Sequence, residues 1–142
     1  MVDFTTFDII KLLDIPRERL QDWMNRGFIK PSIQTAQGKG TKNIFSRYNV
    51  YGIELFKRLL DFGVNREVAS KFVKHLIGFK FEPISGKSGG PFILMRRKDL
   101  EDKDGFQYST NICTLTDGDI DYDIAWVINM KNIFEKIDYK IP

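Results

Sequence analysis

The stretch that decides the fold is residues 15–31, IPRERLQDWMNRGFIKP. Pro16 suits the first turn of a helix, because its missing N–H would have no helical partner there. Ile15, Leu20 and Trp23 follow at helical spacing, and Gly27 is typical of the position just after a helix end. The stretch therefore predicts a short amphipathic helix over 16–26 that ends in a tight turn, with Trp23 in the core.

Further helices are expected on both sides of this segment. A helix is expected before it, because apolar residues recur there at roughly helical spacing: Phe4, Phe7, Ile10, Leu12 and Leu13. Thr5 or Thr6 is available as the N-cap of this helix. After it, Ser46 can cap a third helix that Gly63 ends, and Asn65 can cap a fourth helix through Ile77. Between them, the polar, glycine-containing residues 34–43 predict a β-hairpin or flexible wing, with Ile44–Phe45 as its returning strand.

The character of the chain changes after Gly78. Residues 82–91 hold two prolines and three glycines, which indicates a loop or boundary. Three strand-like runs follow, at Pro91–Arg97, Phe106–Leu115 and Tyr122–Met130, with acidic turns at 99–105 and 117–121 between them. A short amphipathic terminal helix is expected after them, with Ile133, Phe134 and Ile137 on its apolar face. The simplest architecture for this part is a small three-stranded antiparallel sheet packed by a helix.

These elements predict an α+β protein. Residues 1–78 are expected to form a winged helix-turn-helix of about four helices plus a β-wing, and residues 79–90 a linker. Residues 91–142 are expected to form a strand-rich dimerisation or effector segment. The 142 residues suffice for one compact domain, or for one small domain with a substantial appendage.

Charge is divided unevenly along the chain. Residues 1–80 carry 14 Lys+Arg against 8 Asp+Glu, a balance of +6, whereas residues 81–142 carry 8 against 11, a balance of −3. A polyanionic partner is therefore expected to meet the first half. The single Cys113, the lack of a signal peptide and the lack of an apolar run of about 18 residues together predict a soluble, cytoplasmic protein without disulfide, metal site or membrane span.

The helix over 16–26 has the composition of a groove-binding helix. The major groove of B-DNA admits one α-helix, which needs a buried face to hold it and an exposed face of hydrogen-bond donors. Arg and Gln side chains can bind guanine and adenine edges, while lysines in a glycine-rich wing over 34–45 can reach phosphates. The expected DNA contacts are Arg17, Arg19, Gln21, Arg26, Lys39, Lys42, Arg47 and Tyr48.

Four segments in this order resemble the MerR family over about residues 5–77. They are IPRERL at 15–20, GFIKP at 27–31, FSRYNV at 45–50 and LDFGV at 60–64. The resemblance implies a winged helix-turn-helix that binds double-stranded DNA as a homodimer, in a bacterial-type transcriptional regulator. The family's long dimerising helix does not follow residue 77, and no metal-binding cysteine set supports its metal-sensing branch.

Other functions have weaker support in the sequence. Gly86-Lys87-Ser88 lacks the first glycine of a P-loop, since position 81 is Phe81. Asp117–Asp123 resembles a calcium loop, but Tyr122 and Ile128 stand at its required glycine and glutamate positions. His75 and Cys113 have no acid partner at motif spacing, so neither an enzyme nor a cofactor is expected. The alternative function is a protein–protein interaction module, which Glu18 and Asp22 on the expected recognition helix favour; a small-molecule effector is conceivable but has no support.

Overall fold

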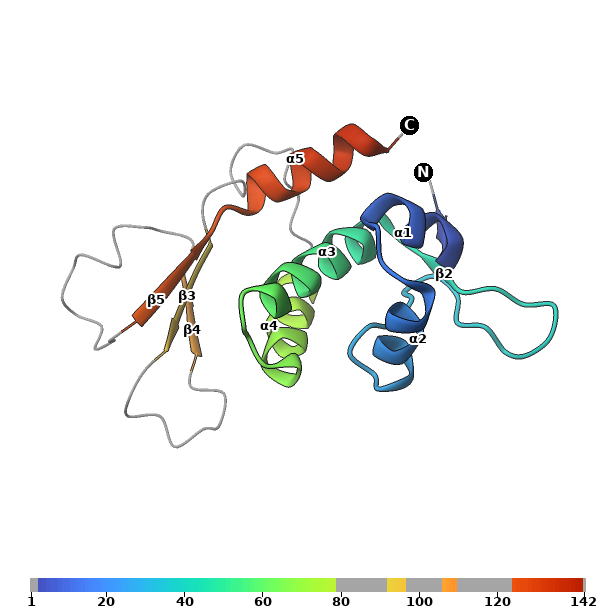
Figure 1. Ribbon diagram of the computed structural model, residues 1–142, viewed down its shortest axis with the longest axis horizontal. Helices are drawn as coiled ribbons and strands as arrows, with labels where there is room; N and C mark the ends of the chain where they lie inside the picture. The colour runs from blue at the N-terminus through green and yellow to red at the C-terminus, as the bar shows by residue number, and fades with distance from the viewer. Residues whose placement is uncertain (1–2, 79–91, 97–105, 110–123, 142) are drawn as a thin grey trace. The chain divides into compact units, whose positions relative to one another are not determined.

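The computed structural model describes residues 3–78, 92–96, 106–109 and 124–141, and it is a mixed structure of helices and small antiparallel sheets (Figure 1). The elements of the first half are β1 (Phe4–Thr5), α1 (Thr6–Leu13), α2 (Arg17–Asn25), β2 (Ile44–Phe45), α3 (Arg47–Asp61) and α4 (Arg66–Gly78). Those of the second half are β3 (Phe92–Arg96), β4 (Phe106–Ser109), β5 (Ile124–Ile128) and α5 (Met130–Lys140). The α+β class is thus confirmed.

Two compact units divide the chain. The first comprises residues 1–81 together with 137–142, and the second comprises residues 82–136. The expected segment 91–142 is therefore shared between the units, because the last turn of α5 belongs with the N-terminal half. The expected linker at 79–90, the acidic turns and Cys113 lie outside the described residues.

Reciprocal capping boxes begin α1 and α3, and the expected cap at Asn65 begins α4 by accepting a bond from the Glu67 N–H at 2.8 Å. The Thr5 hydroxyl accepts a bond from the Asp8 backbone N–H, and the Asp8 carboxylate accepts one from the Thr5 N–H at 2.8 Å. Ser46 and Asn49 form the same reciprocal pair at the start of α3. Each pair satisfies two backbone donors that the first turn leaves unbonded. The expected caps at Thr5 and Ser46 are confirmed, whereas Phe4 belongs to β1 instead of the helix.

Glycines end α2 and α3 in the same way. Gly27 has φ +78° and Gly63 has φ +96°, values in the left-handed region that a side chain disfavours. After α2, the N–H groups of Gly27 and Phe28 donate to the carbonyls of Met24 and Trp23. The equivalent bonds follow α3, where Val64 donates to Leu59 at 2.9 Å. Both ends are Schellman motifs, as the sequence predicts for Gly27.

The core of the first unit forms around α3. Residues 49–56 of that helix are all buried, and Phe56 has no exposed surface. Trp23 of α2 lies edge-on to Phe56, with ring centroids 4.9 Å apart, and Phe28 lies 5.9 Å away on the same ring. Trp23 is only 4% exposed, so its expected place in the core is confirmed.

The first unit also contains a two-stranded sheet beside a long loop. β1 pairs antiparallel with β2, with Phe4 opposite Phe45, and a single bridge joins Gln34 to Ile44. The Ile44–Phe45 strand was expected, but its strand partner is the N-terminus. The 34–43 loop has no alternating apolar residues to bury against a sheet, which explains why no longer ladder forms along it. In Figure 1 this loop projects away from the helices.

The second unit contains a three-stranded antiparallel sheet in the order β4-β3-β5. Leu94 of β3 lies opposite Tyr108 of β4 and Trp126 of β5. The expected antiparallel sheet is therefore confirmed over these strands, and residues 91, 97, 110–115 and 122–123 of the expected runs lie outside the described residues. The last run was expected to continue to Met130, but Asn129 caps α5 by accepting a bond from the Asn132 N–H at 3.0 Å, and Met130 begins the helix.

None of the helices in the described ranges is long and apolar enough to cross a membrane.

Candidate nucleic-acid interface

The outer face of α2 is polar, and its charges have a definite order around the helix. Leu20 and Trp23 are buried, and successive residues rotate by about 100° around an α-helix. Glu18, Gln21 and Asn25 are exposed and lie on the side opposite the buried pair. Arg17 and Arg19, two positions apart, lie on opposite flanks of this outer face.

The candidate residues of α2 differ in their partners. Among the described residues, Arg17 and Arg19 have no acidic partner, and both are exposed. Arg26 instead bonds Asp22 at 2.9 Å, and Arg66 of α4 approaches the other oxygen of Asp22 at 3.8 Å. The Gln21 amide donates to the Asn25 side chain at 3.0 Å. The two flanking arginines are thus available to an anion, while Arg26 is already paired.

The position of α2 depends on contacts from α3 and α4. Lys74 donates to the carbonyl of Gly27 at 2.9 Å, and the Ser70 hydroxyl donates to the carbonyl of Phe28 at 3.1 Å. At the other end, Lys57 donates to the carbonyl of Leu13 at 2.8 Å. Leu13 is the last residue of α1 and its carbonyl has no helical donor, while Gly27 and Phe28 belong to the turn that follows α2. Sequence reasoning missed all three positioning residues, because nothing near them in the chain marks their distant partners.

Side chains give the 34–43 loop its internal bonds. The Asn43 amide oxygen accepts from the Ala36 N–H at 2.9 Å, and the Thr41 hydroxyl accepts from the Gln37 N–H at 2.7 Å. Lys39 stands between Gly38 and Gly40, both with positive φ. Lys39 and Lys42 are exposed, and neither has an acidic partner in the described part of the chain. The loop thus presents two lysines on a backbone with its own hydrogen bonds.

Asn49 joins the base of this loop to α3. Its side-chain oxygen accepts bonds from the N–H groups of Ser32 at 3.0 Å and Ser46 at 2.9 Å, and the residue is 7% exposed. A buried acceptor that serves two backbone donors fixes both segments, because leaving those donors unbonded would cost free energy. Arg47 and Tyr48, next to this junction, are therefore held at the start of α3.

An aspartate from the end of the chain reaches the same region. Tyr51, only 3% exposed, donates its hydroxyl hydrogen bond to the Asp138 carboxylate. The same carboxylate oxygen lies 3.5 Å from Arg47 Nη1, and Tyr48 packs edge-on against Tyr51. Burial, and then the bond to Asp138, raise the pKa of Tyr51 above its usual value. Sequence reasoning placed Arg47 and Tyr48 on the interface but did not connect Asp138 to them.

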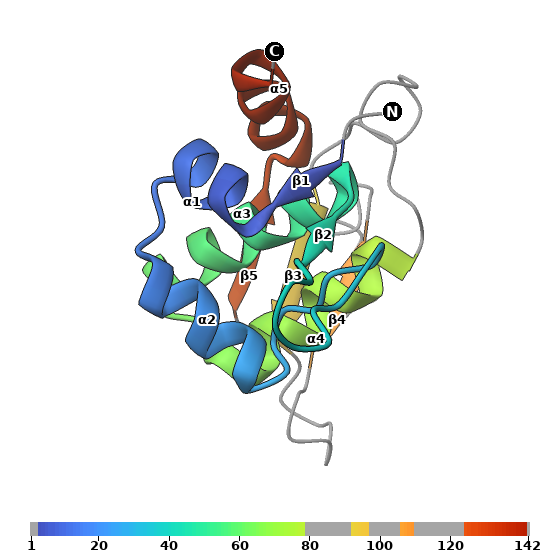
Figure 2. The same ribbon diagram turned by 90° about the vertical axis from the view of Figure 1, so that its right-hand side faces the viewer.

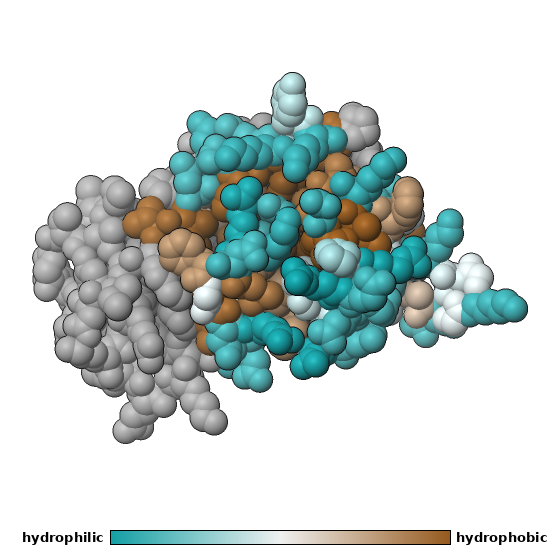
Figure 3. Space-filling view, viewed as in Figure 1, coloured by the Kyte–Doolittle hydropathy of each residue, from teal (hydrophilic) through white to brown (hydrophobic). Residues whose placement is uncertain are grey.

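Some, but not all, of the elements that carry the candidate residues lie on one side of the first unit. Figure 2 shows α2 and the 34–43 loop together on the side that faces the viewer, next to β1 and β2. Figure 3 shows that hydrophilic side chains cover the surface over α2. α2 and the 34–43 loop thus share one side of the first unit, while Arg47 is engaged with Asp138.

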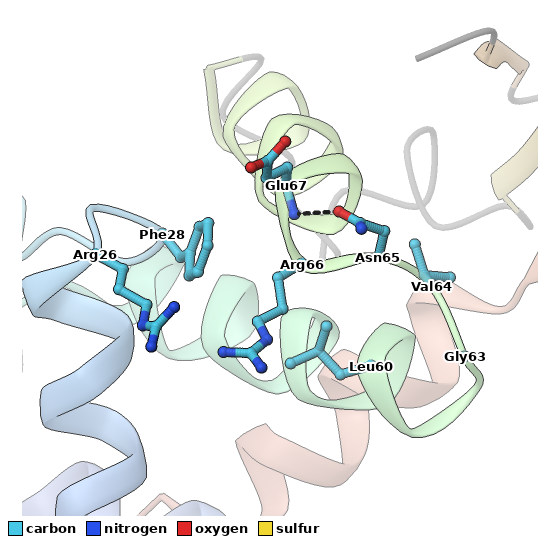
Figure 4. Close-up of a pocket in the computed structure, with 8 residues that line it drawn as sticks. All are labelled: Arg26, Phe28, Leu60, Gly63, Val64, Asn65, Arg66 and Glu67. Carbon is cyan, nitrogen blue, oxygen red and sulfur yellow. Dashed lines mark hydrogen bonds between the residues drawn. The ribbon is translucent and has the colours of Figure 1, made fainter. Parts of the chain in front are cut away.

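A pocket of about 500 Å³ lies between the end of α2, the end of α3 and the start of α4. Figure 4 shows the guanidinium groups of Arg26 and Arg66 directed into it, with Phe28 and Leu60 on its wall. Both arginines belong to the ion-pair cluster around Asp22 described above. The cations of the pocket are therefore already neutralised in part.

The described residues contain no group of three or more histidine, cysteine or acidic side chains placed to hold a metal ion. No protein-family model matches the chain, and no curated protein matches it in sequence.

Proposed function

We propose that residues 1–78 are a MerR-like winged helix-turn-helix that binds double-stranded DNA and that the protein is a transcriptional regulator. In this proposal α2 enters the major groove and the 34–45 segment is the wing that follows the phosphate backbone. A single module of this size covers little DNA, so the protein is proposed to act as a homodimer on two half-sites.

The observation that carries the proposal is the distribution of charge on α2. A helix with side chains is about 10–12 Å wide, close to the width of the major groove of about 12 Å. Cations on opposite flanks can then reach the phosphates of both groove walls, while the outermost side chains face the bases. Arg17 and Arg19 occupy those flanks without acidic partners among the described residues, and the Gln21 and Asn25 amides are on the outer face.

The loop lysines support the same function. Lys39 and Lys42 are exposed on the 34–43 loop, which lies on the side that carries α2 (Figure 2), and the glycines beside Lys39 allow the loop backbone to approach a surface closely. Each lysine that contacts a phosphate releases about one counterion, so binding should weaken steeply with salt.

The first prediction concerns Arg17 and Arg19. Arg17→Ala and Arg19→Ala should each weaken binding to DNA from upstream of the protein's own gene, and each should lower the slope of log K against log salt by about one unit. Both side chains are exposed, so thermal unfolding should stay close to wild type. Fluorescence anisotropy across a salt series, with nonspecific competitor present, measures the affinity and the slope together.

Lys136→Ala is the matched control, because Lys136 is an exposed helical cation with no acidic partner among the described residues. It removes the same charge from α5 and should leave the slope unchanged. Equal effects of all three variants would mean that binding depends on net charge alone. Unaltered binding by both arginine variants would remove α2 from the interface.

The second candidate function, a protein–protein interaction module, is favoured by Glu18 at the centre of the outer face of α2. Its carboxylate would face the bases, and it has no cationic partner in the described residues. Asp22 argues less strongly for this function, because Arg26 and Arg66 neutralise its charge. Absence of any preference for the upstream DNA over competitor, at every salt concentration, would favour the interaction module.

A further inference from the structure

We infer that Asp138 occupies the position of a DNA phosphate on Arg47, so that the end of α5 withholds one cation of the proposed interface. This inference rests on the proposed function and adds an intramolecular regulation to it. It depends on contacts within the first unit, to which both residues belong.

Three groups meet at the Asp138 carboxylate. One of its oxygens accepts the hydrogen bond of the buried Tyr51 hydroxyl and lies 3.5 Å from Arg47 Nη1. The pair joins residues 91 positions apart in the chain. A carboxylate and a phosphate are alternative partners for the same guanidinium, because both present oxygen acceptors to its N–H donors. While Arg47 is paired with Asp138, its guanidinium is therefore withheld from a phosphate.

The two sides of this contact differ in how firmly they are held. The Asp138 side chain is 25% exposed and is bonded to Tyr51, whereas the Arg47 side chain is 41% exposed. Ile137 and Ile141, 3% and 9% exposed, bury the last turn of α5 on either side of Asp138. Of the two side chains, Asp138 is consequently the more firmly held.

The same aspartate also influences Tyr48. Asp138 is bonded to the buried Tyr51. The ring of Tyr48 packs edge-on against the ring of Tyr51, with the two ring centroids 6.4 Å apart. Displacement of Asp138 would thus change the surroundings of two expected DNA contacts, Arg47 and Tyr48. No other acid in the described residues contacts Arg47.

The position of Asp138 in the chain makes the contact suitable for regulation. α5 is one continuous helix, but residues 130–136 belong to the second unit and residues 137–140 to the first. The helical turn that carries Asp138 is therefore continuous in the chain with a segment of the second unit. Withdrawal of that turn would release the cation to DNA.

Asp138→Asn tests the inference in the full-length protein. Asparagine has nearly the same shape and keeps an oxygen to accept the Tyr51 bond, but it lacks the charge that pairs with Arg47. On a duplex of about 25 base pairs, the variant should bind roughly 3- to 10-fold more tightly than wild type at low salt. Its slope of log K against log salt should be steeper by about one unit, because one more phosphate contact forms.

Arg47→Ala completes a double-mutant cycle. If Asp138 masks Arg47, the alanine substitution should weaken binding several-fold more in the Asp138→Asn background than in wild type. Asp61→Asn is the matched control, because Asp61 is exposed at the far end of α3 and has no ion pair in the described residues. It makes the same chemical change and should not alter the salt slope.

Each outcome decides one of the two proposals. Binding by Asp138→Asn that is equal to or weaker than wild type overturns the masking role, as does an equal gain in Asp61→Asn. If Asp138→Asn does not fold, Asp138→Ser, which also keeps an acceptor for Tyr51, replaces it with the same expected result. A wild-type protein without salt-sensitive DNA binding would refute the proposed function, and the masking role with it.

Discussion

At the scale of single residues, similar side chains have different availability because of their neighbours. Arg17 and Arg19 project from the flanks of α2 without acidic partners among the described residues, whereas Arg26 is bonded to Asp22 at 2.9 Å and Arg47 lies 3.5 Å from Asp138. Exposed ion pairs of this kind add little to stability, so their main consequence is for binding. Four arginines that look equivalent in the sequence are therefore expected to contribute unequally to the interface.

Tyr51 leads to a prediction about alkaline pH. Burial and the bond to Asp138 raise the pKa of Tyr51 in the folded protein above the unfolded value of about 10. The unfolded chain then loses this proton first, so the stabilisation from Tyr51 is complete below about pH 10 and declines as the pH rises further. The free energy of unfolding, measured with urea, should fall less between pH 8 and pH 11 for Tyr51→Phe than for wild type.

The control for this prediction is Tyr139→Phe, because Tyr139 is 93% exposed. Its pH dependence should match that of wild type. A loss of stability above pH 10 that is the same in wild type and in Tyr51→Phe would contradict the assignment to Tyr51.

At the scale of elements, helix ends determine how α2 and α3 connect to the next segment. Gly27 turns the chain out of α2, and Lys74 and Ser70 of α4 then bind the carbonyls at this turn. Gly63 makes the equivalent turn between α3 and α4. The direction of α2, and with it the proposed recognition face, thus depends on glycine turns and on side chains from another helix.

The prediction for these turns is a loss of stability in Gly63→Ala. The position has φ +96°, and a methyl group there would contact nothing within 4 Å, so the cost comes from backbone conformation alone. We expect a decrease of about 1–2 kcal/mol in the free energy of unfolding, measured by urea denaturation. Gly63→Asn should cost less, because asparagine tolerates the left-handed region; equal stability of the alanine variant and wild type would contradict the strain argument.

At the scale of the whole molecule, the last turn of α5 belongs to the N-terminal unit. Ile137 and Ile141 are buried there, although more than 50 residues separate them from the end of α4. The second unit is consequently inserted between α4 and this turn, and its chain leaves and rejoins the first unit. This arrangement is the basis for the proposed control of Arg47.

Ile137→Ala tests the contribution of that turn. Removing a buried isoleucine should lower the free energy of unfolding by about 2–5 kcal/mol. A Trp126→Phe background leaves Trp23 as the single tryptophan, so its fluorescence in urea reports on the first unit. Tyr139→Ala, at a fully exposed position of the same turn, should stay within about 0.5 kcal/mol of its parent. Equal effects of the two substitutions would show that the turn does not stabilise the first unit.

Local signals made much of the first unit predictable from the sequence. The caps at Thr5 and Ser46, the turn at Gly27 and the burial of Trp23 all depend on residues within a few positions of each other or on helical periodicity. The antiparallel sheet of the second unit followed from apolar runs separated by turns. The pairing of Phe4 with Phe45 did not, because a two-residue strand has too few residues to show a period of two.

The sequence by itself determined the helices, their ends, the polar face of α2 and the basic character of the first half. Only the tertiary structure decided which cations are paired, which side chains hold α2, and that Asp138 lies against Arg47 and Tyr51. The physical reason is distance along the chain. Caps, turns and amphipathic faces are set by interactions across one or two turns of backbone, whereas a contact across 87 or 91 residues forms only after packing has brought its partners together.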